Sequence, residues 1–135
     1  MAVTVKKRAI SQLFVADCAS ANIVGDIVRV SADAVGGVYQ TSSLDINYGS
    51  VQLAFGIIIQ KITSTRCIVQ TGGEVVGVYT GLTPGGPLFI NGSSRLTHTV
   101  PAHPAAGVRW SYFVAQALSS DALLLRVQRP IKIRA

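Results

Sequence analysis

Hydrophobic and polar residues alternate along most of this chain with the two-residue period of β-strands. A helix needs a period near 3.6 residues, and no segment keeps that longer period beyond two turns. Short runs of Val, Ile, Thr and aromatic residues are separated by Gly, Asn, Asp and Ser, as strands are by turns. The pattern favours an all-β barrel or sandwich. The predicted strands are residues 11–17, 25–32, 37–42, 51–62, 65–71, 74–79, 87–90, 108–118 and 122–129.

The longest apolar run, residues 51–62, has two unequal faces. Alternation places Leu53, Phe55, Ile57 and Ile59 on one face, together with Val51, and this face is predicted to be core. The opposite face is semi-apolar, so we expect it to be able to contact a neighbour.

The strand pattern occurs twice. Residues 55–70 (FGIIIQKITSTRCIVQ) align without gaps with residues 111–126 (SYFVAQALSSDALLLR), each an apolar strand, a short polar turn and a second strand. Upstream, residues 26–42 and 87–99 each contain a strand, a Gly-containing turn and a shorter strand. We therefore predict two similar β-hairpin halves in one domain, residues 11–135, preceded by an extended N-terminal arm, residues 1–10.

The stretch from Thr80 to Val108 is rich in Gly and Pro and contains both histidines. In its LTPGGP segment a proline presets φ for the second position of a turn, and the next glycine takes the positive φ of a type II turn. The NGSS segment predicts a hairpin turn of type I′. The predicted structural turn residues are Pro84, Gly85, Gly86, Asn91 and Gly92.

Motifs that carry chemistry are absent from the sequence. His98 and His103 lie on a Pro-rich loop with no Cys, Asp or Glu close in sequence, so no metal site is expected. There is no nucleophile elbow and no dinucleotide-binding glycine pattern, and the aspartates adjoin predicted turns. We predict that the protein is not an enzyme, has no catalytic residues and needs no cofactor.

The two cysteines allow two interpretations. Cys67 shares a strand face with Val69, which favours a small buried hydrophobic residue. A disulfide between Cys18 and Cys67 stays open as an alternative for a protein that meets oxidising surroundings.

Composition narrows the class of protein. The chain has 135 residues, 49% of them hydrophobic and only 13% charged, against roughly 25% charged in ordinary soluble domains. The run 51–62 is too short to span a bilayer, which needs about 20 residues, and the N-terminus lacks the continuous apolar region of a signal peptide. We therefore expect no membrane partner, and we predict that the surplus apolar surface is buried against other subunits in a homo-oligomer.

The formal net charge is +6, and most basic residues lie near the two ends. Basic ends suit an acidic partner surface, whereas a nucleic-acid partner is not expected because the aromatic residues are not interleaved with basic ones. The arm alternates in period 2 before its basic triplet, so it could add a strand to a neighbour's sheet edge. The predicted partner-interface residues are Val3, Val5, Lys6, Lys7, Arg8, Arg129, Lys132 and Arg134.

A family resemblance rests on the succession CIVQTGGEVVGVYTGLTPGGPLFI, a short hairpin, a Pro-containing loop and GVRWSYFVAQALSSDALLLRVQRP. This succession resembles a β-rich module of tailed-bacteriophage virion proteins, over about residues 24–129. Its best motif is GLTPGGPLF, residues 81–89, and the segment YFVAQAL, residues 112–118, departs from the Val-Gly pair that often precedes the closing strand.

The resemblance implies a structural protein of the phage particle. It would be a capsid decoration (cement) protein on the virion surface, assembled in the host cytoplasm, with the major capsid protein and further copies of itself in a homotrimer as partners. A tail or fibre-attachment component is the alternative within this class. From a different class comes a carbohydrate- or receptor-binding module in which Trp110 and Tyr112 form a stacking platform.

Overall fold

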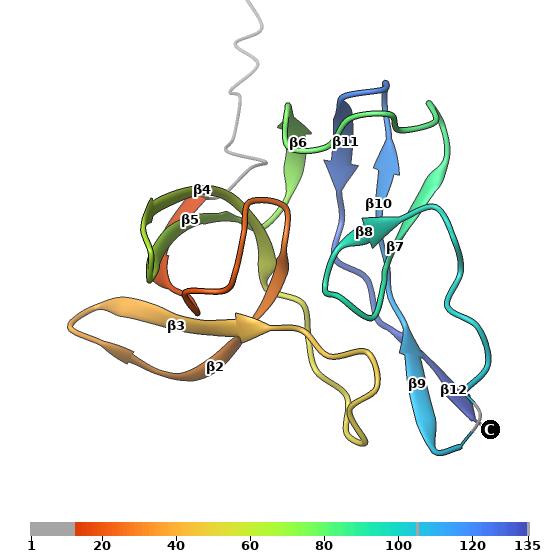
Figure 1. Ribbon diagram of the computed structural model, residues 1–135, viewed down its shortest axis with the longest axis horizontal. Helices are drawn as coiled ribbons and strands as arrows, with labels where there is room; N and C mark the ends of the chain where they lie inside the picture. Colours follow the sequence, from red (N-terminus) through yellow and green to blue (C-terminus); the bar gives the residue numbers. More distant parts are fainter. Residues whose placement is uncertain (1–12, 105, 135) are drawn as a thin grey trace, which may run out of the picture.

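The computed structural model describes residues 13–104 and 106–134, so the predicted N-terminal arm lies outside the described residues. The described chain is all-β, as predicted, and contains strands and turns but no helix (Figure 1). The strands are β1 (Leu13–Asp17), β2 (Ile27–Val35), β3 (Val38–Ser43), β4 (Gly56–Thr63), β5 (Arg66–Gln70), β6 (Gly73–Val76), β7 (Pro87–Ile90), β8 (Leu96–Thr97), β9 (Val108–Ser111), β10 (Phe113–Ala117), β11 (Ala122–Leu125) and β12 (Ile131–Arg134).

Strands β1 to β5 form a closed barrel, which we call the barrel half (Figure 1, left). The hairpins β2–β3 and β4–β5 are antiparallel, β2 pairs with β4, and β1 pairs with β5. A short parallel pairing between β1 and β3 closes the barrel, with Ala16 opposite Tyr39 and Asp17 opposite Gln40.

Strands β6, β7, β8, β10 and β11 form an open five-stranded sheet, which we call the open half (Figure 1, right). Its strand order is β6-β11-β10-β7-β8, and the neighbours in the barrel half run β1-β5-β4-β2-β3. The hairpin β2–β3 therefore corresponds to β7–β8, and β4–β5 corresponds to β10–β11. The predicted repeat is present as a shared strand order.

A two-stranded antiparallel ribbon of β9 and β12 extends from the open half (Figure 1). The prediction of a single strand over residues 108–118 is wrong. The segment forms two strands, β9 and β10, which are separated at the buried Tyr112. The sequence pattern does not predict β12, because Pro130 separates it from the predicted strand that ends at Arg129.

The apolar side chains form two clusters. One fills the barrel and contains Val28 and Ile58. The other lies between the halves and contains Ile27 and Ile57, which alternate with those two residues on the opposite faces of β2 and β4. Both faces are therefore buried within one chain where these two strands begin. The open half contributes Val75, Leu82, Leu88, Ile90, Leu96, Val114, Leu123 and Leu125, among others, to the second cluster.

The prediction for residues 51–62 is partly wrong. The strand begins at Gly56, so the first five residues of the run are not part of it. Val51 and Leu53 are exposed, whereas Ile57 and Ile58 are both fully buried although they point to opposite faces. Ile58, from the face expected to contact a neighbour, lies in the cluster inside the barrel, whereas Ile57, from the face predicted to be core, lies in the cluster between the halves.

Two tyrosine hydroxyls join the halves. The Tyr112 hydroxyl donates to the carbonyl oxygen of Gln52 and accepts from its N–H at 3.3 Å. The Tyr79 hydroxyl donates to the Gly25 carbonyl at 2.6 Å and accepts from the Leu96 N–H at 2.9 Å. Burial raises the pKa of both hydroxyls. Each tyrosine thus satisfies main-chain groups that would otherwise lose hydrogen bonds on burial.

The predicted turns have different outcomes. Gly85 has φ +80°, and the Gly86 N–H donates to the Thr83 carbonyl at 2.9 Å, as in the predicted type II turn. The type I′ prediction at Asn91–Gly92 is wrong because neither residue has a positive φ. The Asn91 Oδ1 instead accepts hydrogen bonds from two backbone N–H groups, and the left-handed residue is Ser94, with φ 61°.

Candidate functional site

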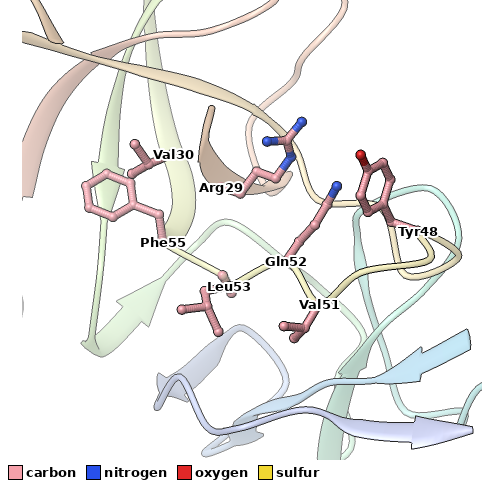
Figure 2. A pocket seen from close by; sticks show the side chains of 8 residues that line it. Arg29, Val30, Tyr48, Val51, Gln52, Leu53 and Phe55 are labelled. Atoms are coloured by element: carbon pink, nitrogen blue, oxygen red, sulfur yellow. The ribbon is translucent and has the colours of Figure 1, made fainter. Parts of the chain in front are cut away.

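A groove with a volume of about 540 Å³ lies beside the point where β2 and β4 separate (Figure 2). This volume is within the range of ligand-binding pockets. One side is formed by two consecutive residues of β2, and the other by the segment that leads into β4. The lining residues are Arg29, Val30, Tyr48, Val51, Gln52, Leu53, Ala54 and Phe55. We call this surface the Arg29 groove.

Hydrogen bonds to Gln52 fix the far side of the groove. Both main-chain groups of Gln52 bond to the Tyr112 hydroxyl, and its Oε1 accepts from the Asp45 N–H at 2.8 Å. With Gln52 held inward, its neighbours Val51 and Leu53 are turned outward and are 48% and 68% exposed. The segment thus presents aliphatic side chains to solvent from an anchored backbone.

Within the described residues, the side chain of Arg29 has a buried nitrogen atom without a hydrogen-bond partner. This atom is its Nε, and the guanidinium extends between the ends of the groove (Figure 2). Two other arginines are paired with carboxylates: Arg66 lies 3.0 Å from Asp17, and Arg95 lies 3.2 Å from Asp26. Buried donors are normally satisfied, so the unpaired Nε indicates a missing acceptor.

Three aromatic rings pack beside the groove. The ring centroids of Phe14, Tyr39 and Phe55 lie 5.4 to 5.9 Å apart in pairs, which is the range of favourable aromatic contacts. Phe55 also lines the groove, and Tyr39 is 42% exposed. The groove therefore continues into an aromatic surface on the barrel half.

The C-terminal ribbon carries the predicted interface residues that the structure describes. Lys132 and Arg134 are exposed on β12, and Arg129 is exposed in the segment before it. The Lys132 Nζ lies 5.6 Å from the centroid of the Trp110 ring, and Ile131 is 70% exposed. The ribbon combines cationic and apolar groups, and neither strand contains an acidic residue. Val3, Val5, Lys6, Lys7 and Arg8 lie outside the described residues.

The predicted stacking platform of Trp110 and Tyr112 is wrong. Tyr112 is completely buried in the cluster between the halves, so its ring offers no surface to a sugar. Trp110 is partly buried, and its Nε1–H donates to the Tyr48 carbonyl at 3.0 Å. The sequence pattern placed both residues on one strand face, but that face points into the molecule.

The two cysteines are free and buried. Burial, together with a hydrogen bond with Cys18, raises the pKa of the Cys67 thiol to about 12. The thiol is thus protonated at neutral pH, and a thiol is a much weaker nucleophile than a thiolate. This agrees with the interpretation of Cys67 as a small buried residue.

His98 holds the Pro-Gly turn in place. Its Nε2 accepts from the Thr83 N–H at 3.0 Å, and its Nδ1 lies 2.8 Å from the Pro87 carbonyl oxygen. These contacts fit a neutral ring with the proton on Nδ1. His103 is exposed.

The described residues contain neither a candidate metal site nor a helix that could span a membrane. Over residues 13–104 and 106–134, no three His, Cys, Asp or Glu side chains are grouped so that they could hold a metal ion. The same residues contain no helix that is long and apolar enough to cross a membrane.

No sequence pattern points directly to the Arg29 groove. Arg29 is one basic residue in a strand of ordinary pattern, and its lack of a partner depends on contacts far apart in the chain. A usable signal existed in Val51 and Leu53, two large apolar residues close to the Gly49–Ser50 turn. A long run that starts at a turn need not be strand from its first residue.

Comparisons with protein-family models, with curated proteins and with solved structures give no match to this chain.

Proposed function

We propose that this chain is a structural protein of a tailed-bacteriophage particle that binds the outer capsid surface as a homotrimer and stabilises the shell. The observation that carries the proposal is the ribbon of β9 and β12, where exposed Lys132 and Arg134 lie beside the exposed Ile131 without any carboxylate on either strand. Such a surface complements an acidic protein surface.

The exposed apolar side chains add support. Large hydrophobic residues with more than 45% of their area exposed include Leu13, Val15, Ile23, Val30, Val35, Val51, Leu53, Ile62, Val76, Val100, Leu118 and Ile131. A decoration protein stabilises a shell by burying surface across the junctions of capsid subunits, and stable interfaces bury on the order of 1,600 Å². The resemblance of residues 81–89 to the GLTPGG turn of phage virion modules points to the same class.

The first test locates the chain in a particle. Phage particles produced together with this chain are purified and examined by electron microscopy, and the copies of the chain are counted by quantitative mass spectrometry. Hundreds of copies on the head support a decoration protein, whereas a dozen or fewer at one vertex or on the tail support the alternative of a tail or fibre-attachment component. Particles without the chain would overturn both.

The second test examines the ribbon. The double variant Lys132→Glu and Arg134→Glu reverses two exposed charges, and we expect it to bind particles at least about tenfold more weakly because like charges then face the acidic surface. Arg126→Glu is the control, since Arg126 is also exposed but lies outside both strands of the ribbon. Equal loss in both variants would contradict a role for the ribbon.

The third test concerns the arm. Deletion of residues 1–9 is expected to abolish particle binding and leave the fold intact, because the arm carries the other predicted contacts. Undiminished occupancy on particles would refute this part of the proposal. Sedimentation velocity of the full chain tests the trimer separately, and a monomer at all concentrations would overturn it.

A further inference from the structure

We propose that the Arg29 groove binds an extended segment of a partner protein, which pairs with the free edge of β2 and places a carboxylate against Arg29. This inference goes beyond the proposed function, because it names a site and a ligand chemistry that do not depend on a phage particle.

The first observation is a free strand edge. β2 has nine residues, but it pairs with β4 only at Ile27 and Val28. The Val28 carbonyl accepts from the Phe55 N–H at 2.8 Å, and after this bond the segment of Phe55 diverges from β2. From Arg29 onward this edge of β2 has no strand partner among the described residues, although the other edge continues to pair with β3.

Strand alternation identifies the main-chain groups that are available. In a β-strand the N–H and C=O of a residue point to the same side, and the side alternates from one residue to the next. The main-chain groups of Val28 point toward β4, because its carbonyl accepts from the Phe55 N–H. The N–H and C=O of Val30 therefore point to the same side, which is the groove. Register shifts follow between Val30 and Ala32 and between Ala32 and Val35. These irregularities limit an added strand to the few residues nearest the groove.

The second observation is the Nε of Arg29, which is buried without a hydrogen-bond partner among the described residues. No salt bridge to Arg29 occurs within the described residues. A guanidinium binds a carboxylate through parallel N–H···O bonds, which are among the stronger hydrogen bonds in proteins. A carboxylate on the docked segment would supply the missing acceptor.

The groove walls select the remaining side chains of the segment. Val30 and Phe55 lie at one end of the groove, and Val51 and Leu53 also line it, with side chains that point away from Arg29 (Figure 2). A strand that pairs with a sheet edge gains affinity from main-chain hydrogen bonds and specificity from the pockets for alternate side chains. The fitting segment is therefore aliphatic at alternate positions, with one Glu or Asp where it passes Arg29.

The test uses the full chain and a defined peptide. The probe is acetyl-Thr-Val-Glu-Val-Thr-Val-amide, titrated into the ¹⁵N-labelled protein and followed by NMR. We expect saturable shifts of the Val30 amide and the Arg29 Nε–H. The Gln analogue of the peptide should bind about tenfold more weakly, because a hydrogen bond to a charged acceptor is lost. An analogue with N-methylated backbone should lose binding, because it cannot form the main-chain bonds.

Two protein variants complete the test. Arg29→Gln should remove the preference for Glu over Gln in the peptide, and Leu53→Ser, at a largely exposed position, should weaken both peptides equally. Arg126→Gln is the control and should change neither. The amide spectrum verifies the fold of each variant.

The proposal is overturned if the peptide does not bind, if the shifts lie away from the groove, or if the Glu and Gln peptides bind equally. Saturation by decanoate without binding of the peptide would also overturn it, since the groove would then be a site for a free aliphatic carboxylate. Each result is independent of binding to particles.

Discussion

The barrel half and the open half use the same strand order, yet only the first is closed. In the barrel half β1 meets β3, and side chains from five strands enclose a cluster of their own. In the open half the corresponding strands, β6 and β8, are not paired with each other, and β8 has only two residues. The open sheet instead packs its inner face on the outside of the barrel half.

This difference teaches how an open sheet can be stable without closing. Its apolar face is covered by Ile27 and Ile57, which are outward-facing residues of the barrel strands. The barrel half has an interior that is independent of its partner, whereas the open half depends on the barrel half for its core. We therefore expect the two halves to unfold together, in one cooperative transition.

The largest effect on stability is expected from separating β4 and β5 of the barrel half at Gly56. A Cβ added there would clash with the Gln70 carbonyl oxygen and lie 2.7 Å from the Val69 Cγ1, so β4 and β5 would have to separate. Gly56→Ala should lower the free energy of unfolding by about 3 kcal/mol, measured by urea denaturation. Gly92→Ala, in the open half, meets nothing within 4 Å and should change it by less than about 0.5 kcal/mol. Similar losses in both variants would contradict the importance of the close contact between β4 and β5.

A smaller effect is expected at the contact between the halves. Tyr112→Phe keeps the buried ring but leaves the N–H and C=O of Gln52 without the hydroxyl, at an expected cost of about 1 to 3 kcal/mol. The control Tyr39→Phe removes a hydroxyl from an exposed ring of the barrel half. Circular dichroism and Trp110 fluorescence should still report the same transition. Two separate transitions would show that the halves unfold independently.

The smallest effect is expected at the closing strand β1. Hydrogen bonds from Gln40 and Arg66 lower the pKa of the Asp17 carboxyl below 3.8, so the folded state favours its ionised form. This stabilisation is present above the ordinary pKa and is lost as the pH falls through the lowered value. The difference in urea midpoint between the wild type and Asp17→Asn should therefore shrink from pH 7 to pH 2. Gln40→Ala should weaken this trend, and a constant difference would contradict it.

The sequence predicted the strands and their repetition because both depend on local alternation. The prediction for residues 87–90 agrees with β7 in both bounds, and Gly85 has the predicted positive φ. The closure of the barrel could not be predicted, since it depends on the parallel pairing of β1 with a strand more than twenty residues away. Period-2 patterns identify strands but do not specify their partners.

The site was less predictable than the fold. Lys132 and Arg134 were identified from charge near the chain end, and they are exposed on one strand. Arg29 was not identified, because a buried Nε without an acceptor is a property of assembled strands and not of composition. Tyr112 was misjudged for a similar reason: alternation defines a face, but only packing decides whether this face is covered.

The strands of the barrel half are contiguous in the chain, and all of them precede β6. During translation, every partner needed for barrel closure has left the ribosome once Gln70 has emerged, while the second half is still being synthesised. The nascent chain can thus complete its first sheet early. The strands of the open half are synthesised later and can then pack on the barrel half, which is already folded. The half that is made second is thus the half that depends on the other for its core.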